Sequence, residues 1–67
     1  MEFIEKARVR LNHWIAHNDS HQEEYGKFAA SLEEAGQTAS ALQVREMVGL
    51  SKKSSECLRR ALQSLEQ

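Results

Sequence analysis

The fold is decided by residues 4–35, which read IEKARVRLNHWIAHNDSHQEEYGKFAASLEEA. Counting in sevens from Ile4 gives one set of positions, and the residues three places later give a second set. Eight of these ten positions are apolar or aromatic, and the ten are Ile4, Ala7, Leu11, Trp14, Asn18, His21, Tyr25, Phe28, Leu32 and Ala35. A repeat that keeps its phase over five heptads predicts one continuous amphipathic helix over residues 2–35, with Trp14, Tyr25 and Phe28 in the core.

A second helix is predicted after a short turn. Gly36 follows the last heptad position, where glycine readily adopts the left-handed conformation that ends a helix. Thr38 is a suitable N-cap for a helix over residues 39–65. The apolar stripe of that helix is Ala41, Val44, Val48, Ser51, Ser55, Leu58, Leu62 and Leu65. Because a turn over residues 36–38 is short, the sequence predicts an all-α, antiparallel αα-hairpin as one domain of residues 1–67.

A broken arrangement of four shorter helices is the alternative. Asn18, Asp19 and Ser20 are all suitable N-caps, and Ser20 with Glu23 forms a capping box. Gly49 marks a second place where a helix can end. The unbroken register of the first stripe favours two long helices instead.

Composition excludes several classes of protein. The 67-residue chain has a formal net charge of −1, no proline and one cysteine, so a disulfide scaffold within the chain is excluded. No apolar run is long enough for a transmembrane helix, and no secretory signal is recognisable, so we expect a cytoplasmic protein without a membrane partner. The near-neutral charge removes the electrostatic argument for binding nucleic acid or anionic lipid.

Polar residues interrupt both stripes at one height. Folding the chain about residues 36–37 brings together positions whose numbers sum to about 73. Asn18 and His21 then lie opposite Ser55 and Ser51. Since buried polar groups are costly unless they are hydrogen-bonded, we expect a buried polar layer that fixes register and partner choice. A ligand or metal site in the core of a bundle is the other interpretation.

Three histidines on the first helix suggest a metal site. His13, His17 and His21 are spaced by four residues, so neighbouring pairs can present two nitrogens to one ion. Glu24 lies on the same face as His21, and Cys57 is expected near His17 across the hairpin. Together these five residues form a candidate Zn²⁺ or Ni²⁺ site. Histidines on amphipathic helices are more often boundary residues, and no His-Glu-x-x-His or Cys-x-x-Cys motif is present.

An enzymatic function is not expected. Catalysis by Cys57 would need a base and an oxyanion hole, and a helix interior offers no free backbone N–H groups for such a hole. The three glycines are isolated, so the chain has no phosphate-binding loop.

A third interpretation is a DNA-binding helix-turn-helix over residues 44–62, with Gly49 in the turn. That motif needs a small residue where this chain has Arg45 and an apolar residue where it has Ser55. We therefore do not expect nucleic acid as a partner.

Residues 11–28, LNHWIAHNDSHQEEYGKF, together with Glu56-Cys57-Leu58 in the second helix, resemble a group of small prokaryotic helical domains of uncharacterised function. The shared pattern is Leu-x-His-Trp-Ile-x-His-Asn-x-x-His-x-x-x-Tyr/Phe. The resemblance implies a helical hairpin, brings no known activity, and draws attention to His13, Trp14, His17, Asn18 and His21.

Two helices alone bury few side chains. Chains shorter than about 70–80 residues rarely gain more than roughly 3–5 kcal/mol from one core without a staple. The commonest solution is a twofold dimer that forms a four-helix bundle. Four residues widen the apolar surface of the second helix: Met47, Leu50, Cys57 and Ala61. The leading expectation is a non-enzymatic homodimer that presents a helix face to a protein partner, and metal binding is the alternative function.

Overall fold

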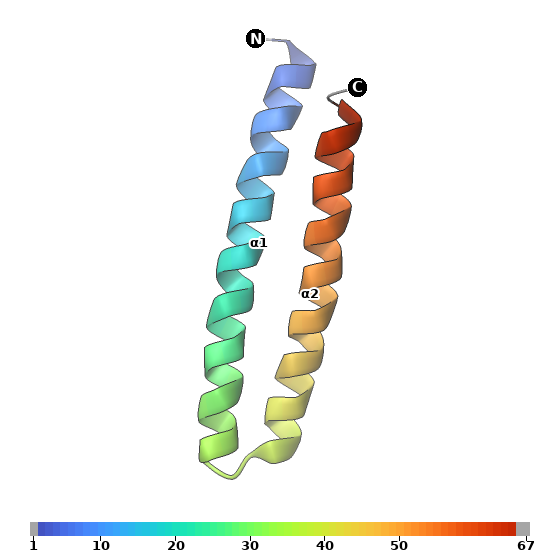
Figure 1. Cartoon of the computed structure of the whole chain (residues 1–67). Helices are drawn as coiled ribbons and strands as arrows, with labels where there is room; N and C mark the ends of the chain where they lie inside the picture. The colour runs from blue at the N-terminus through green and yellow to red at the C-terminus, as the bar shows by residue number, and fades with distance from the viewer. Residues whose placement is uncertain (1, 66–67) are drawn as a thin grey trace.

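The fold is a hairpin of two long helices, seen in a computed structural model that describes residues 2–65. Helix α1 (Phe3–Glu34) and helix α2 (Thr38–Leu65) lie side by side and run antiparallel (Figure 1). The molecule measures 51 × 16 × 11 Å. The all-α hairpin predicted from the heptad count is therefore confirmed.

Neither helix is interrupted where the sequence offers a break. Helix α1 continues through Asn18, Asp19 and Ser20, and helix α2 continues through Gly49. The arrangement of four shorter helices is therefore wrong, and the helix-turn-helix lacks its turn. A side-chain cap stabilises a new helix start by about 1 kcal/mol, whereas a break would disrupt backbone hydrogen bonds and a stripe that packs along the whole hairpin.

Backbone hydrogen bonds close the turn between the helices. Gly36 has a φ of +80°, in the left-handed region. The N–H of Gly36 donates to the carbonyl of Glu33 at 3.0 Å, and the N–H of Gln37 donates to the carbonyl of Leu32 at 2.8 Å. This pair of bonds is a Schellman motif. The carbonyl of Gln37 then accepts from Ala41 at 3.0 Å, so α2 begins one residue earlier than the sequence predicts.

The seam between the helices uses the predicted stripe of α2. All eight of its positions are buried or half-buried. On α1 the series from Leu11 is half-buried as predicted, but its companion series lies four residues later rather than three. That companion series is Arg8, Ile15, Gln22 and Ala29.

Trp14 and Phe28 are consequently not core residues: they are 47% and 58% exposed. A helix can turn either flank of a heptad stripe toward its neighbour, and α1 turns the flank that carries Ala29. Ala29 is fully buried, and the fully buried Ala41 contributes an equally small side chain from α2. Small side chains in the seam let two helices approach closely, whereas bulky aromatic side chains would hold them apart.

The hairpin has little core of its own. The buried side chains among the described residues are Ala29, Ala41 and Ser55, which are at most 1% exposed. None of the large apolar side chains in residues 2–65 is fully buried. Eight large apolar side chains in this range are exposed to solvent, among them Phe3, Trp14 and Phe28.

Candidate functional site

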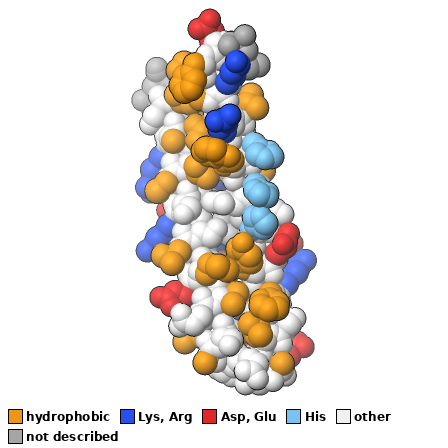
Figure 2. Space-filling view, turned by 180° about the vertical axis from the view of Figure 1, so that it is seen from behind, with side chains coloured by type: hydrophobic (Ala, Val, Ile, Leu, Met, Phe, Trp, Pro, Cys, Tyr) orange, Lys and Arg blue, Asp and Glu red, His pale blue; other side chains and the backbone are white. Residues whose placement is uncertain are grey.

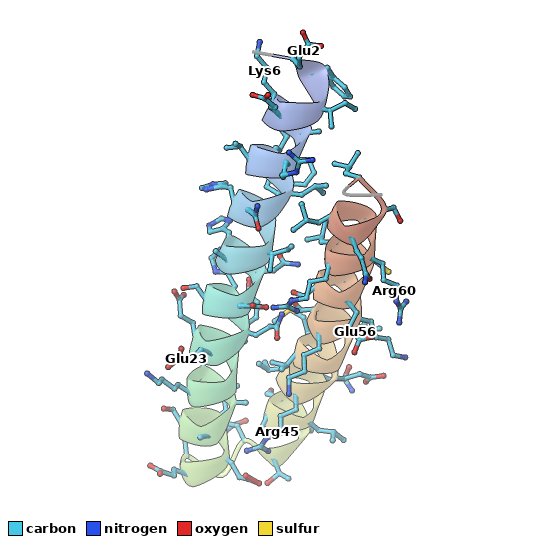
Figure 3. All side chains as sticks on the ribbon, turned by 45° about the horizontal axis from the view of Figure 1, so that its top comes forward. Glu2, Lys6, Glu23, Arg45, Glu56 and Arg60 are labelled. Atoms are coloured by element: carbon cyan, nitrogen blue, oxygen red, sulfur yellow. The ribbon has the colours of Figure 1, made fainter. Side chains whose placement is uncertain are left out.

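The hairpin has two unlike faces, and one of them is charged. On this face Arg59 donates to Asp19, and Arg45 donates to Glu33 at 2.8 Å. Figure 3 shows Arg45 on the side of α2 that faces α1, while other labelled charged residues point outward. The side chains of both pairs are 44–53% exposed, so each pair contributes little to stability.

The opposite face is here called the apolar face. On α1 it is formed by the residues three places after each heptad position, which lie outside the seam. Its members are Ala7, Trp14, His21 and Phe28 of α1, with Met47 and Ala61 on the adjoining flank of α2. Figure 2 shows hydrophobic side chains spread over both helices on this side, with the histidines along one edge. At the end away from the turn the face is hollowed by a groove. Its lining is mainly apolar but includes two cations, and consists of Phe3, Lys6, Ala7, Arg10, Leu11 and Trp14 of α1 with Ala61 and Leu65 of α2.

Four aromatic rings follow one another along this edge of α1. The ring centroids of His13 and His17 are 5.9 Å apart, those of His17 and His21 are 4.4 Å apart, and those of His21 and Tyr25 are 5.7 Å apart. Four-residue spacing places each ring one helical turn from the next on the same side. The closest polar contact joins the Nε2 atoms of His17 and His21, which are 3.1 Å apart.

His21 has a second polar atom with an unusual environment. Its side chain is 38% exposed, yet its Nδ1 is buried and has no hydrogen-bond partner among the described residues. The nearest carboxylate oxygen is Oε2 of Glu24, 3.8 Å from Nδ1. The imidazole of His21 therefore has another imidazole at one nitrogen and a carboxylate near the other.

The structure brings together only part of the predicted metal site. His17, His21 and Glu24 are close, whereas His13 reaches this group only by stacking on His17. No group of three or more His, Cys, Asp or Glu side chains within residues 2–65 is placed to hold one metal ion. Cys57 is exposed, because it follows the buried Ser55 by two residues, which is about 200° around a helix.

Of the four residues of the predicted polar layer, the structure fully buries Ser55. Ser55 is 1% exposed, and its hydroxyl accepts a hydrogen bond of 2.9 Å from Nε2 of Gln22. Asn18, His21 and Ser51 are half-buried. In the seam, Gln22 provides the polar contact to α2 that the sequence predicted for His21. The reason is that the residues in the seam are those four places after each heptad position, not three. The series that contains Gln22 also contains Arg8, so its hydrophobicity gave no signal that could have identified Gln22.

No helix in residues 2–65 contains an apolar stretch long enough to cross a membrane.

Comparison with known proteins supports the resemblance to an uncharacterised group. Searches of curated proteins and of solved structures gave no significant match. A family model described as "Domain of unknown function (DUF8180)" matches residues 7–65, a range that contains the turn, all of α2 and most of α1. The chain therefore belongs to the DUF8180 family of uncharacterised domains.

Proposed function

We propose that this protein is non-enzymatic and acts through self-association, as a homodimer in which two apolar faces pack into a four-helix bundle whose outer helix surfaces bind a protein partner. The observation that carries the proposal is the exposure of large apolar side chains on one face. Phe3 is 77% exposed, Trp14 47%, Phe28 58% and Met47 41%. Exposed apolar patches of this kind are typical of protein interfaces. The cytoplasmic location expected from the sequence remains a prediction.

The exposed area supports a second copy as the occupant of this face. The chain exposes 5168 Å² for a mass of 7.6 kDa. A compact monomer of that mass exposes about 4300 Å², so the hairpin has roughly 900 Å² in excess. A stable interface of standard size buries about 800 Å² from each partner. The excess is thus of the size that dimerisation removes from solvent.

The apolar face is a better dimer interface than the charged face. Burying the charged face would remove water from the pairs of Asp19 with Arg59 and of Glu33 with Arg45, and desolvation of ion pairs opposes association. On the apolar face, aromatic and aliphatic side chains would instead be transferred out of water, which favours association. Arg10, whose guanidinium lies 6.0 Å from the centroid of the Trp14 ring, borders this surface.

Sedimentation equilibrium at micromolar concentration tests the proposal on a matched pair of variants. Phe28 and Leu42 are 58% and 62% exposed, but Leu42 lies three residues before Arg45 and so on the charged side. We expect the unmodified chain to be a dimer, Phe28→Glu to weaken dimerisation at least tenfold, and Leu42→Glu to leave it unchanged. A helical monomer at every concentration would contradict the proposal, as would equal weakening by both variants.

A further inference from the structure

We propose that His17 and His21 form a bidentate site for a divalent transition-metal ion, Ni²⁺ or Cu²⁺, with Glu24 orienting the ring of His21. The site lies within one helix, at the edge of the apolar face, so both ligands come from the same copy of the chain and none from the dimer partner proposed above. Imidazole nitrogen is a good ligand for both ions. Residues at this spacing on a continuous helix are held one turn apart before any ion arrives, and α1 is continuous from Phe3 to Glu34.

The separation of the two nitrogens matches the requirement of a chelate. The Nε2 atoms are 3.1 Å apart. With metal–nitrogen bonds of about 2.0–2.1 Å, nitrogens at that separation subtend roughly 95–102° at the ion. This range lies between the value of about 90° for square-planar or octahedral coordination and the tetrahedral value of about 109°. The separation is therefore compatible with chelation of Ni²⁺ or Cu²⁺ by the two nitrogens.

An ion can reach the nitrogens without opening the hairpin. His17 is exposed and the side chain of His21 is 38% exposed. The histidines line the solvent edge of the face in Figure 2. Because no third protein ligand stands beside them in residues 2–65, water molecules would fill the remaining coordination positions.

Glu24 supplies the carboxylate that commonly supports a metal-binding histidine. Such a histidine usually donates its second ring N–H to a carboxylate, carbonyl or water. Here Oε2 of Glu24 lies 3.8 Å from Nδ1 of His21, and that nitrogen has no hydrogen-bond partner among the described residues. The carboxylate favours the tautomer with its proton on Nδ1, which leaves the Nε2 lone pair of His21 available to an ion.

The contact between the two rings then has a defined direction without metal. If the proton of His21 is on Nδ1, its bare Nε2 must be the acceptor of the 3.1 Å contact and Nε2–H of His17 the donor. When an ion binds, it takes the place of that proton, and His17 carries its proton on Nδ1 instead. Both rings stay neutral, so binding requires a change of tautomer in His17 alone. Acidic solution opposes binding, because protons compete with the ion for both nitrogens.

Titration of the full chain with NiCl₂, followed by calorimetry and by the histidine ring signals in ¹H–¹⁵N NMR spectra, tests the site. His17→Ala and His21→Ala should each lower the affinity at least tenfold. Glu24→Gln should lower the affinity by about tenfold, the usual loss when such a carboxylate is removed. Circular dichroism of each variant checks that the helices are retained.

One further histidine variant and one cysteine variant are matched controls for the titration. His13 has the same spacing from His17, and Cys57 is the free thiol of the predicted site. His13→Ala and Cys57→Ser should keep the affinity within about twofold.

Nickel binding that survives in His21→Ala would show that His13 and His17 form the site and would overturn the proposal. So would an absence of heat and of signal changes at tenfold excess of Ni²⁺. The Phe28→Glu variant, whose dimerisation is weakened, should bind Ni²⁺ at least as tightly as the unmodified chain does, which separates this test from that of the dimer.

Discussion

Gln22 donates a hydrogen bond of 2.9 Å to the buried hydroxyl of Ser55, although folding the chain about residues 36–37 places Ser55 opposite Asn18. The residue numbers of the bonded pair sum to 77 instead of 73, and both ion pairs across the seam show a similar offset. Side chains on a helix lean toward the N-terminus of that helix. In antiparallel helices the side chains therefore lean in opposite directions along the axis. Two side chains that meet then come from positions about two residues further along each helix, which raises the sum of their numbers by about four.

The bond between Gln22 and Ser55 leads to an unequal pair of substitutions. Ser55→Ala removes the buried hydroxyl and leaves a half-buried amide that water can still reach, so we expect a loss of about 0.5–1 kcal/mol in the free energy of unfolding. Gln22→Ala leaves the hydroxyl of Ser55, 1% exposed, without this partner, and we expect a loss of about 1–2 kcal/mol.

Urea denaturation of the two single variants and of the double variant checks this order. The double variant should lose less than the sum of the two single losses, because neither group is then left without its partner. Additive losses would show that the bond contributes nothing of its own to the hairpin.

The ion pair of Asp19 with Arg59 predicts a small effect that depends on salt. Their side chains are 44% and 53% exposed, so solvent screens the pair strongly. Asp19→Asn should lower the free energy of unfolding by less than about 1 kcal/mol at low ionic strength. The difference should disappear in about 1 M NaCl, where charges are screened within about 3 Å. Thermal unfolding at the two salt concentrations measures it, and a loss that persists in high salt would contradict the prediction.

The register of α1 predicts which of two β-branched residues stabilises the hairpin. Ile15 is half-buried in the seam, whereas Val9 is 61% exposed on the outer side of α1. In the monomeric Phe28→Glu background, Ile15→Ser should lower the free energy of unfolding by about 1–3 kcal/mol, and Val9→Ser by less than about 0.5 kcal/mol. Urea denaturation measures both losses. Equal losses would contradict the placement of Ile15 in the seam and would favour the series that contains Trp14.

Most of the architecture could be predicted from the sequence, because it depends on long, regular features. The heptad series of α1 and the stripe of α2 give two helices, and Gly36 gives the turn between them. Each feature extends over many turns or uses a residue type with few alternatives. The lengths of the two helices and their antiparallel direction follow from these features without any knowledge of the packing.

The rotation of α1 about its own axis could not be predicted in the same way. The series three residues after each heptad position contains Trp14 and Phe28, and the series four residues after contains Ile15 and Ala29. Hydrophobicity favours the first series, whereas close approach of the helices favours the second. This choice placed Gln22 in the seam and left His21 half-buried beside the exposed His17, so the accessibility of the candidate site depended on it.

Glycine provides a final test, since one substitution should have opposite effects at two positions. Gly36 has a φ of +80°, which an L-residue with a side chain adopts only with strain, so Gly36→Ala should lower the free energy of unfolding by about 1–2 kcal/mol. Gly49 lies inside α2, and a Cβ built on it would meet nothing within 4 Å. Gly49→Ala should therefore raise the free energy of unfolding by about 0.5–1 kcal/mol through helix propensity.

The second substitution also distinguishes the two faces as dimer interfaces. Gly49 and Gly26 lie away from the apolar face, and Gly26 lines a hollow on the charged side with Asp19 and Lys52. If two copies pack through their apolar faces, Gly49→Ala will stabilise each chain and leave the dimer dissociation constant unchanged. If the glycines instead allow a second hairpin to approach closely, the added methyl group will weaken the dimer while α2 becomes more stable. Urea denaturation and sedimentation equilibrium on the same protein separate these outcomes.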